Sequence, residues 1–98
     1  MEVNFKMIGM ARRAGKVLVG SSPAVAAIRS GKAAIVIIAS DIGAAVKKKV
    51  TDKCKFYETE CIESAHDSTE ISASVGYPSP VTVITITDKN FIDIIKRP

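Results

Sequence analysis

The sequence predicts an α/β fold: a three-layer α/β/α sandwich around a four-stranded mixed sheet, formed by one domain over residues 1–98. Segments with the hydrophobic periodicity of helices alternate with short β-branched segments that are typical of strands. The segment 33–39, AAIVIIA, is apolar on both faces, which indicates a strand covered by helices on both sides. A chain of 98 residues that is 47% hydrophobic can form one domain with a core.

The first helix is predicted at residues 4–13, because apolar side chains recur there at helical spacing and Gly15 follows as an end signal. The next four residues, 16–19, have the sequence KVLV and form a short strand with β-branched character. Gly20 then begins the turn into the second helix.

The second helix begins within the sequence GSSP. Ser21 or Ser22 can act as its N-cap, because a hydroxyl accepts a hydrogen bond from a free amide of the first turn. Pro23 suits the first helical position, where its missing N–H costs nothing. The helix ends at Gly31, just before the apolar strand.

The third helix is predicted to begin at a cap formed by Ser40 or Asp41 and to extend to about Tyr57. Its apolar face has near i, i+4 spacing and consists of Val46, Val50, Cys54 and Tyr57. Its other positions hold the densest basic run of the chain: Lys47, Lys48, Lys49, Lys53 and Lys55. Such a run is either a solvated outer face or a surface that contacts phosphates without reading sequence.

The last part of the chain is predicted to contain two further strands and two further helices. Acidic residues surround the first of these strands, which indicates an edge strand protected against pairing with other chains. Gly76 ends the first helix, and Pro78 and Pro80 mark the loop that follows. The predicted order is a strand at 60–63, a helix at 68–75, a strand at 81–86 and a final helix capped by Thr87 or Asp88.

Positive charge is concentrated in the first part of the chain. Residues 1–55 hold eleven Lys and Arg against three acids, a net charge of +8, whereas residues 56–98 hold three against seven, a net charge of −4. A basic half is the usual electrostatic footprint of a polyanionic partner. Solubility is the competing explanation for a net charge of +4.

Catalytic, metal and cofactor sites are not predicted. His66, Asp67 and Ser68 are consecutive, so they cannot converge as base, orienting acid and nucleophile. Cys54 and Cys61 are expected to be free thiols, and no Cys or His pair has the spacing of a zinc site. The sequence thus predicts no enzyme, no metal and no cofactor.

Nucleotide binding and membrane insertion are also not predicted. The pattern from Gly15 to Gly20 has the two glycines of a phosphate-binding loop, but Ser21 stands where that loop requires Lys. The chain has no signal peptide and no run of about 18 apolar residues, so we expect a cytoplasmic protein without a membrane partner.

Several segments together resemble a known family: ARRAGKVLVGSSPAVAAIRSGKAAIVIIASD at 11–41, KKKVTDKC at 47–54, the helix end at 71–76 and the strand and helix start at 81–91. They are similar to the kink-turn RNA-binding ribosomal protein superfamily (L-seven-Ae and L-thirty-e type), and within it to the small bacterial members called YlxQ-like. One position departs from the family's helix end, where Ser72 replaces the first glycine. The resemblance extends over nearly the whole chain.

The resemblance implies an α/β/α sandwich that docks on structured RNA. Family members recognise a kinked helix with tandem G·A pairs through the start of their second helix, whose pattern is Gly-x-Asn-Glu-x-x-Lys. Counted from Gly20, these positions are Ser22, Pro23 and Ala26 here, and the spacing to Gly31 equals that of the family. A serine hydroxyl forms one hydrogen bond in place of several, and Pro and Ala side chains form none.

Two functions follow as hypotheses. The first is a monomeric, non-catalytic protein that binds ribosomal or kink-turn RNA and works with ribosomal or translation proteins. Its expected RNA-binding residues are Lys16, Gly20, Ser21, Ser22, Pro23, Ala26, Lys47, Lys48, Val75, Gly76 and Tyr77. The second is a protein-interaction module that keeps the fold, has lost kink-turn recognition, and docks a partner on the apolar segment 21–28.

Overall fold

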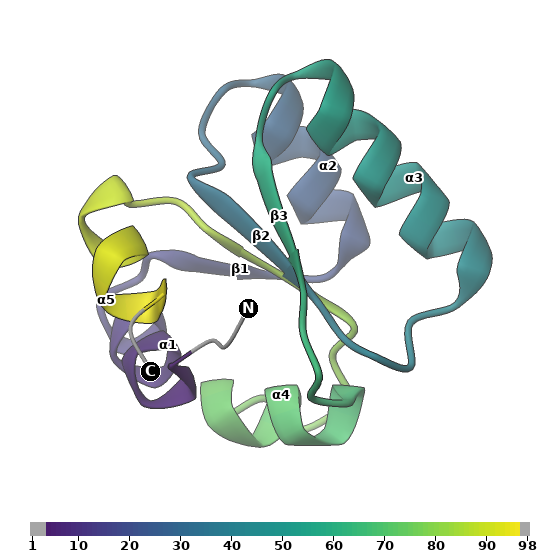
Figure 1. The fold of residues 1–98 in the computed structure, drawn as a ribbon. Coiled ribbons are helices and arrows are strands. Elements are labelled where there is room, and N and C mark those ends of the chain that lie inside the picture. Colours follow the sequence, from purple (N-terminus) through teal and green to yellow (C-terminus); the bar gives the residue numbers. More distant parts are fainter. Residues whose placement is uncertain (1–3, 97–98) are drawn as a thin grey trace.

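The structure is a computed structural model that describes residues 4–96, so residues 1–3 and 97–98 of the predicted domain lie outside it. Helices and strands alternate along these residues in the predicted order (Figure 1). The elements are α1 (Phe5–Arg13), β1 (Val17–Val19), α2 (Ser21–Arg29), β2 (Ile35–Ile38), α3 (Ala44–Phe56), β3 (Glu60–Glu63), α4 (Ser68–Val75), β4 (Val83–Ile86), a 3-10 helix (Lys89–Phe91) and α5 (Ile92–Lys96).

The four strands form one mixed sheet in the order β1-β4-β2-β3. Strand β4 runs antiparallel to both β1 and β2, whereas β2 and β3 are parallel. The register places Ile84 beside both Val19 and Ile37, so β4 lies between the ends of β1 and β2. The predicted four-stranded mixed sheet is thereby confirmed.

Strand β2 supplies side chains to both faces of the sheet, and all four of its residues are buried. Ile35 and Ile37 pack in one hydrophobic cluster, and Val36 and Ile38 pack in the other. This alternation follows from the period of two along a strand. The apolar run therefore marks a strand covered on both sides, as predicted.

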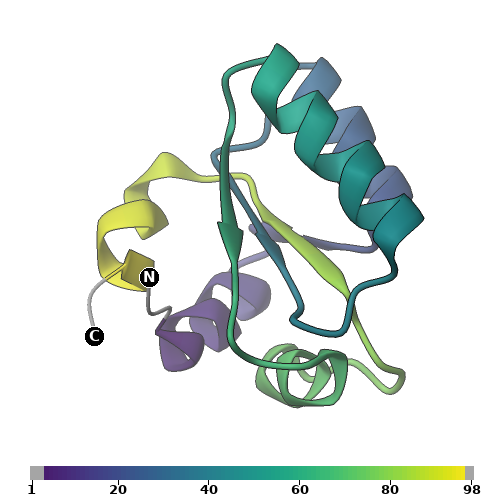
Figure 2. The same cartoon turned by 45° about the vertical axis from the view of Figure 1, so that its right-hand side comes forward.

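Two groups of helices cover the two faces (Figure 2). Helices α2 and α3 enclose the cluster formed with Ala24, Ile28 and Val50. Helices α1, α4 and α5 cover the opposite face, where Ile8, Ile71 and Ile95 are among the buried residues. The three-layer α/β/α sandwich is confirmed, and it places α2 beside α3 on one side of the sheet.

One predicted core position is wrong, and the final helix begins differently from the prediction. Tyr57 was predicted on the apolar face of the third helix, but it is the C-cap of α3 and its side chain is 41% exposed. The last helix begins with one 3-10 turn, in which the Asp88 carboxylate accepts a hydrogen bond from the Asn90 N–H. Asp88 thus caps the 3-10 turn, while the Thr87 hydroxyl donates to the Lys16 carbonyl.

Thr85 is a weak point of the core. It is fully buried on β4, and its Oγ1 has no hydrogen-bond partner among residues 4–96. We expect Thr85→Val to raise the free energy of unfolding by about 1 kcal/mol, because it removes an unpaired buried hydroxyl at nearly constant volume. Urea unfolding measures the change. Thr85→Ala, which leaves a void, is the control and should destabilise the protein; a valine variant as unstable as the alanine variant would contradict the prediction.

Candidate nucleic-acid interface

Several segments meet at the edge of the sheet where β1 and β2 end and β4 begins, which we call the α2 edge. The Gly20 N–H donates to the Val83 carbonyl at 2.9 Å, and the Ala39 N–H donates to the Thr82 carbonyl at 2.8 Å. Helix α2 begins directly after β1, and α3 begins shortly after β2 (Figure 1). The carboxyl ends of strands are where α/β sheets commonly bind ligands.

Helix α2 begins differently from the prediction. Its N-cap is Gly20, with φ 106° and ψ 163°, and neither Ser21 nor Ser22 makes a side-chain cap. Pro23 is the third helical residue, not the first. The helix starts earlier because Gly20 adopts a positive φ that L residues rarely reach, and this conformation turns the chain directly out of β1. The first two amide N–H groups, those of Ser21 and Ser22, have no partner within the helix.

The exposed face of α2 is small. Ser22, Pro23 and Ala26 are exposed, and Ser21 is half-buried. The apolar residues between and after them lie in or against the core: Ala24, Val25, Ala27 and Ile28. The prediction that segment 21–28 as a whole is an apolar docking surface is therefore wrong, because these residues cover the sheet.

The start of α3 also differs from the prediction. Its N-cap is Gly43, which has no side chain to cap the helix. Asp41, predicted to cap α3, instead accepts hydrogen bonds from the Ser68 N–H at 2.8 Å and the Ser68 hydroxyl at 2.7 Å. The Ser68 hydroxyl is the main cause that lowers the pKa of the Asp41 carboxyl below its ordinary value. The loop before α3 is thus tied to the start of α4.

Helix α4 supplies its own negative charge at its start. The Asp67 carboxylate accepts from the Glu70 N–H at 2.9 Å, and the Glu70 carboxylate accepts from the Asp67 N–H at 3.1 Å, which forms a capping box. His66 Nδ1 lies 3.1 Å from the second Glu70 oxygen. The hydrogen bond from the Asp67 N–H is the main cause that lowers the pKa of the Glu70 carboxyl, and the hydrogen bond with His66 is the second cause.

The helix starts at this edge therefore differ in charge. Neither α2 nor α3 has an acid in its first turn or a side chain that caps it. The positive ends of these two helix dipoles remain uncompensated by their own side chains, whereas that of α4 is compensated. An uncapped helix start offers backbone donors and partial positive charge to an anion such as a phosphate group.

Lys47 and Lys48 lie in the second turn of α3, and each forms an ion pair at the surface. Lys47 Nζ is 2.6 Å from a Glu63 carboxylate oxygen at the end of β3, and Lys48 Nζ is 3.0 Å from an Asp52 oxygen. The pair with Glu63 places Lys47 at the β3 side of this edge, because Glu63 lies beside Ile38, the last residue of β2, whereas β1, which leads into α2, is at the other end of the strand order. Exposed ion pairs contribute only about 0–1 kcal/mol, so both lysines can exchange a carboxylate for a phosphate.

The predicted contact residues at the end of α4 form a separate group. Val75 is buried in the core, so its side chain is not available to a ligand. Gly76 ends α4 in the left-handed conformation, and the Tyr77 N–H donates to the Ser72 carbonyl at 2.9 Å. Tyr77 is 39% exposed, and the Arg12 guanidinium lies 5.7 Å from the centroid of its ring, a cation–π geometry.

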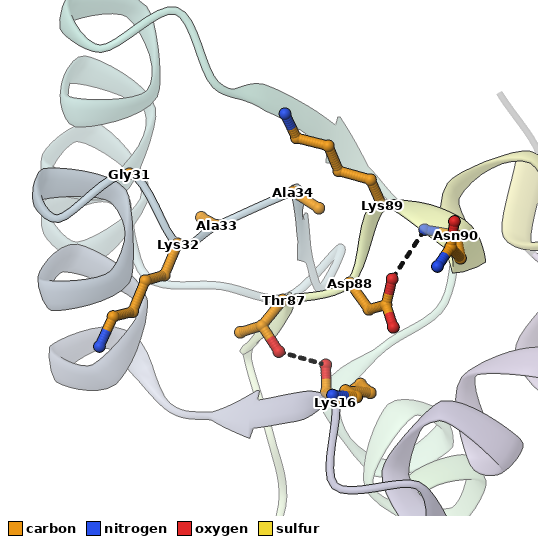
Figure 3. Close-up of a pocket in the computed structure, with 9 residues that line it drawn as sticks. All are labelled: Lys16, Gly31, Lys32, Ala33, Ala34, Thr87, Asp88, Lys89 and Asn90. Carbon is orange, nitrogen blue, oxygen red and sulfur yellow. Dashed lines mark hydrogen bonds between the residues drawn. The ribbon is translucent and has the colours of Figure 1, made fainter.

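Lys16 does not join the residues at the start of α2. Its carbonyl accepts from the Thr87 N–H at 2.9 Å, beyond the end of β4, and β1 separates it from Gly20. Four residue steps along an extended chain span about 13 Å. Lys16 instead lines a pocket with Lys32 and Lys89 at the opposite end of the sheet (Figure 3).

Sequence reasoning found the α2 start but missed two features of the site. One is the contact between Asp41 and Ser68, which are 27 residues apart. The other is the group of Lys16, Lys32 and Lys89, which the chain brings together from three separate segments. Neither has a local signal in the sequence, because both depend on how the strands pair.

The described residues contain neither a metal-binding cluster nor a membrane-spanning helix. Among residues 4–96, no group of three or more His, Cys, Asp and Glu residues could hold a metal ion. None of the described helices is long and apolar enough to cross a membrane. Cys54 and Cys61 are both free thiols.

Acid should destabilise the protein through Asp41 and Glu70. Both carboxyl groups have lowered pKa values in the folded state, so their stabilisation is present above the unfolded pKa near 4 and is lost as the pH falls through the folded value. We expect Asp41→Asn to lower the Tm at pH 7 and to lose less Tm between pH 7 and pH 3 than the wild type. Circular dichroism measures both Tm values. Asp93→Asn, an exposed acid on α5, should match the wild type; a parallel pH dependence in both variants would contradict the assignment.

Comparison with known proteins gives the family. Residues 3–96 match the ribosomal protein L7Ae/L30e/S12e/Gadd45 family. The chain is 41% identical over 85 residues to the RNA-binding protein YlxQ of Enterococcus faecium, covering 87% of this chain and 80% of that protein. It is 32% identical over 87 residues to the YlxQ protein of Bacillus subtilis strain 168, covering 89% and 85%.

A solved structure agrees with the fold. A protein of unknown function from Bacillus halodurans C superposes with a TM-score of 0.85 at 29% identity, covering 92% of this chain and 89% of that one. The match to the family spans nearly the whole chain, and the two YlxQ relatives exceed 30% identity over most of it. The chain therefore belongs to the ribosomal protein L7Ae/L30e/S12e/Gadd45 family, in its bacterial YlxQ-like branch.

Proposed function

We propose that this protein is a non-catalytic, cytoplasmic RNA-binding protein of the ribosome or translation machinery, and that it docks on kinked RNA with its α2 edge. One observation supports the proposal most directly. The starts of α2 and α3, which no side chain caps, lie at the same edge of the sheet, and Lys47 lies near the start of α3. The names of the YlxQ relatives, which are RNA-binding proteins, agree with this ligand.

The start of α2 can bind a phosphate group even though its side chains depart from the family pattern. The amide N–H groups of Ser21 and Ser22 and the exposed Ser22 hydroxyl are donors at the positive end of the helix. Pro23 has no N–H and contributes no donor. The interface on α2 thus relies on backbone donors and one hydroxyl, which position RNA but read few base edges.

Lys47 and Lys48 supply positive side-chain charge near the start of α3. Their lysine side chains hold phosphates as flexible point charges, without a fixed geometry. If three phosphates are neutralised at this edge, the logarithm of the binding constant should fall with the logarithm of the salt concentration with a slope of about −2 to −3. Recognition of the kink then depends mainly on the shape of the RNA backbone.

The alternative is a protein-interaction module that has lost the RNA site. The observation that favours it is the exposure of Pro23 and Ala26, which present small apolar surfaces where the family pattern has Glu and Lys. The exposed area is limited, because the neighbouring apolar residues of α2 lie in the core. A partner bound there would associate with little dependence on salt, in contrast to RNA.

An added negative charge at the α2 start tests the proposal. Ser22→Glu should weaken binding of a kink-turn RNA at least tenfold, because a carboxylate at this position repels phosphate. The same carboxylate favours the helix dipole, so the Tm should not fall. Thr69→Glu is the matched control: Thr69 is the exposed second residue of α4, which already has its acidic cap. Equal loss of affinity in both variants would show that only net charge matters.

The same site can be strengthened by the family's own residues. We expect Ser22→Asn, Pro23→Glu and Ala26→Lys together to raise the affinity for a kink-turn RNA over a straight duplex of equal length by about tenfold. All three positions are exposed, so the fold should tolerate them. Fluorescence anisotropy at two salt concentrations measures both RNAs. If the triple variant gains nothing and the wild type binds both RNAs weakly and equally, kink-turn recognition through α2 is wrong.

A further inference from the structure

We propose that the end of the sheet opposite the α2 edge contains a second RNA site, a groove that binds single-stranded RNA. The groove consists of two adjoining pockets and includes Lys32, Lys89, Arg29 and Tyr57. It rests on the proposed function only in that RNA is the ligand. It adds a second binding surface, so that one protein molecule can hold two RNA segments.

The first pocket is lined by three lysines. It has a volume of about 470 Å³, and Lys16, Lys32 and Lys89 surround a floor that includes Ala34 and Thr87 (Figure 3). Hydrogen bonds hold the three segments together: the Thr87 N–H donates to the Lys16 carbonyl at 2.9 Å, and the Ala34 N–H donates to the Ile86 carbonyl at 2.8 Å. Lys16 directly precedes β1, Lys32 lies in the loop between α2 and β2 with its N–H bonded to the Ala27 carbonyl, and Lys89 begins the 3-10 helix.

The charge of this pocket favours an anionic ligand. All three lysines are exposed, and within residues 4–96 none of them forms an ion pair. Asp88 is the one acid that lines the pocket, and its carboxylate accepts the Asn90 N–H at 2.9 Å, turned towards the 3-10 helix (Figure 3). The lining thus has a net positive charge in the absence of a ligand.

The second pocket adds an aromatic surface. It has a volume of about 520 Å³ and shares Gly31, Ala33, Ala34 and Lys89 with the first. It is also lined by Arg29 and by Tyr57, whose ring packs edge to face against Phe56 at 4.9 Å between centroids. Phe56 is 78% exposed and Tyr57 is 41% exposed, so both rings are accessible to a ligand.

Two acids also line the second pocket, and they limit where a phosphate can lie. The Glu60 carboxylate is engaged by Lys96 at 2.6 Å. Glu58 remains as a negative group next to Tyr57, so phosphates should lie towards Lys89 and Arg29 and a base towards the tyrosine. Basic side chains next to an exposed aromatic ring are the usual composition of a single-stranded nucleic-acid site.

The arrangement fits an extended chain better than a single anion. The ammonium groups of Lys32 and Lys89 extend to different sides of the pocket, so they do not converge on one point (Figure 3). A nucleic-acid strand has phosphates at regular intervals and can contact separated charges. The groove lies beyond the end of α2, whose nine residues span about 13 Å, so it is separate from the α2 edge.

The test is a ternary complex with the full chain. The protein is first saturated with an unlabelled kink-turn RNA and then titrated with a fluorescent oligouridine of roughly eight nucleotides. We expect the oligomer to bind while the kink-turn RNA stays bound. The double variant Lys32→Gln and Lys89→Gln should weaken oligomer binding about tenfold and reduce its salt slope by about 1.4, since each lost contact on a single strand removes about 0.7.

Two further variants test whether the loss of binding comes from base stacking on Tyr57 and from charges within the groove, or only from the lower net charge of the protein. Tyr57→Leu should weaken oligomer binding about tenfold, because it removes a stacked base without changing charge. The matched control, Lys6→Gln with Lys53→Gln, removes the same charge from α1 and α3 and should leave oligomer binding within about twofold, because exposed charges outside the groove are screened by salt. The Lys32 and Lys89 variant should leave kink-turn binding unchanged.

Several results would overturn the inference. Displacement of the oligomer by kink-turn RNA would place both ligands on one site, and equal loss in the control variant would reduce the effect to net charge. Equal binding of a straight duplex, lost in the same variant, would overturn the single-strand assignment. The proposed function is judged separately: Ser22→Glu reports on the α2 edge, and oligomer binding that depends on Lys32 and Lys89 supports the groove even if kink-turn binding fails.

Discussion

The burial of β2 on both faces is the constraint on which the rest of the structure depends. Each of its residues, from Ile35 to Ile38, is at most 1% exposed, and alternate side chains fill two separate clusters. A shift of one residue in register would exchange the two sets, so β4 and β3 must pair with β2 in one way. The helices must then divide between the two faces, with α2 and α3 on one side.

The candidate interface is a consequence of that division. Strands β1 and β2 end at the same edge of the sheet because each pairs with the start of β4. The helices that follow them therefore begin side by side, and their dipoles point in the same direction. The acids near this edge are engaged elsewhere: Asp41 binds Ser68, Asp67 and Glu70 cap α4, and Glu63 pairs with Lys47. The starts of α2 and α3, which no side chain caps, thus remain accessible to an external anion.

The opposite end of the sheet has a different character. There the positive charge comes from lysine side chains and not from helix starts. Lys16, Lys32 and Lys89 come from three segments that strand pairing brings together. The aromatic pair of Phe56 and Tyr57 lies at the end of α3. On the two proposals made above, the domain would bridge two RNA segments, with the shape of a kinked RNA recognised at one end and an unpaired strand bound at the other.

The sequence by itself determined the order of the elements, the three-layer sandwich and the position of the α2 start, because hydrophobic periodicity and glycine signals are local properties of the chain. Tertiary structure alone decided the caps and the grouping of charges. The N-cap of α2 is Gly20 and not a serine, and Asp41 binds Ser68 and does not cap α3. Lys16 lies at the opposite end of the sheet from Ser22. Each of these depends on contacts between segments far apart in the chain, and such contacts exist only once the strands have paired.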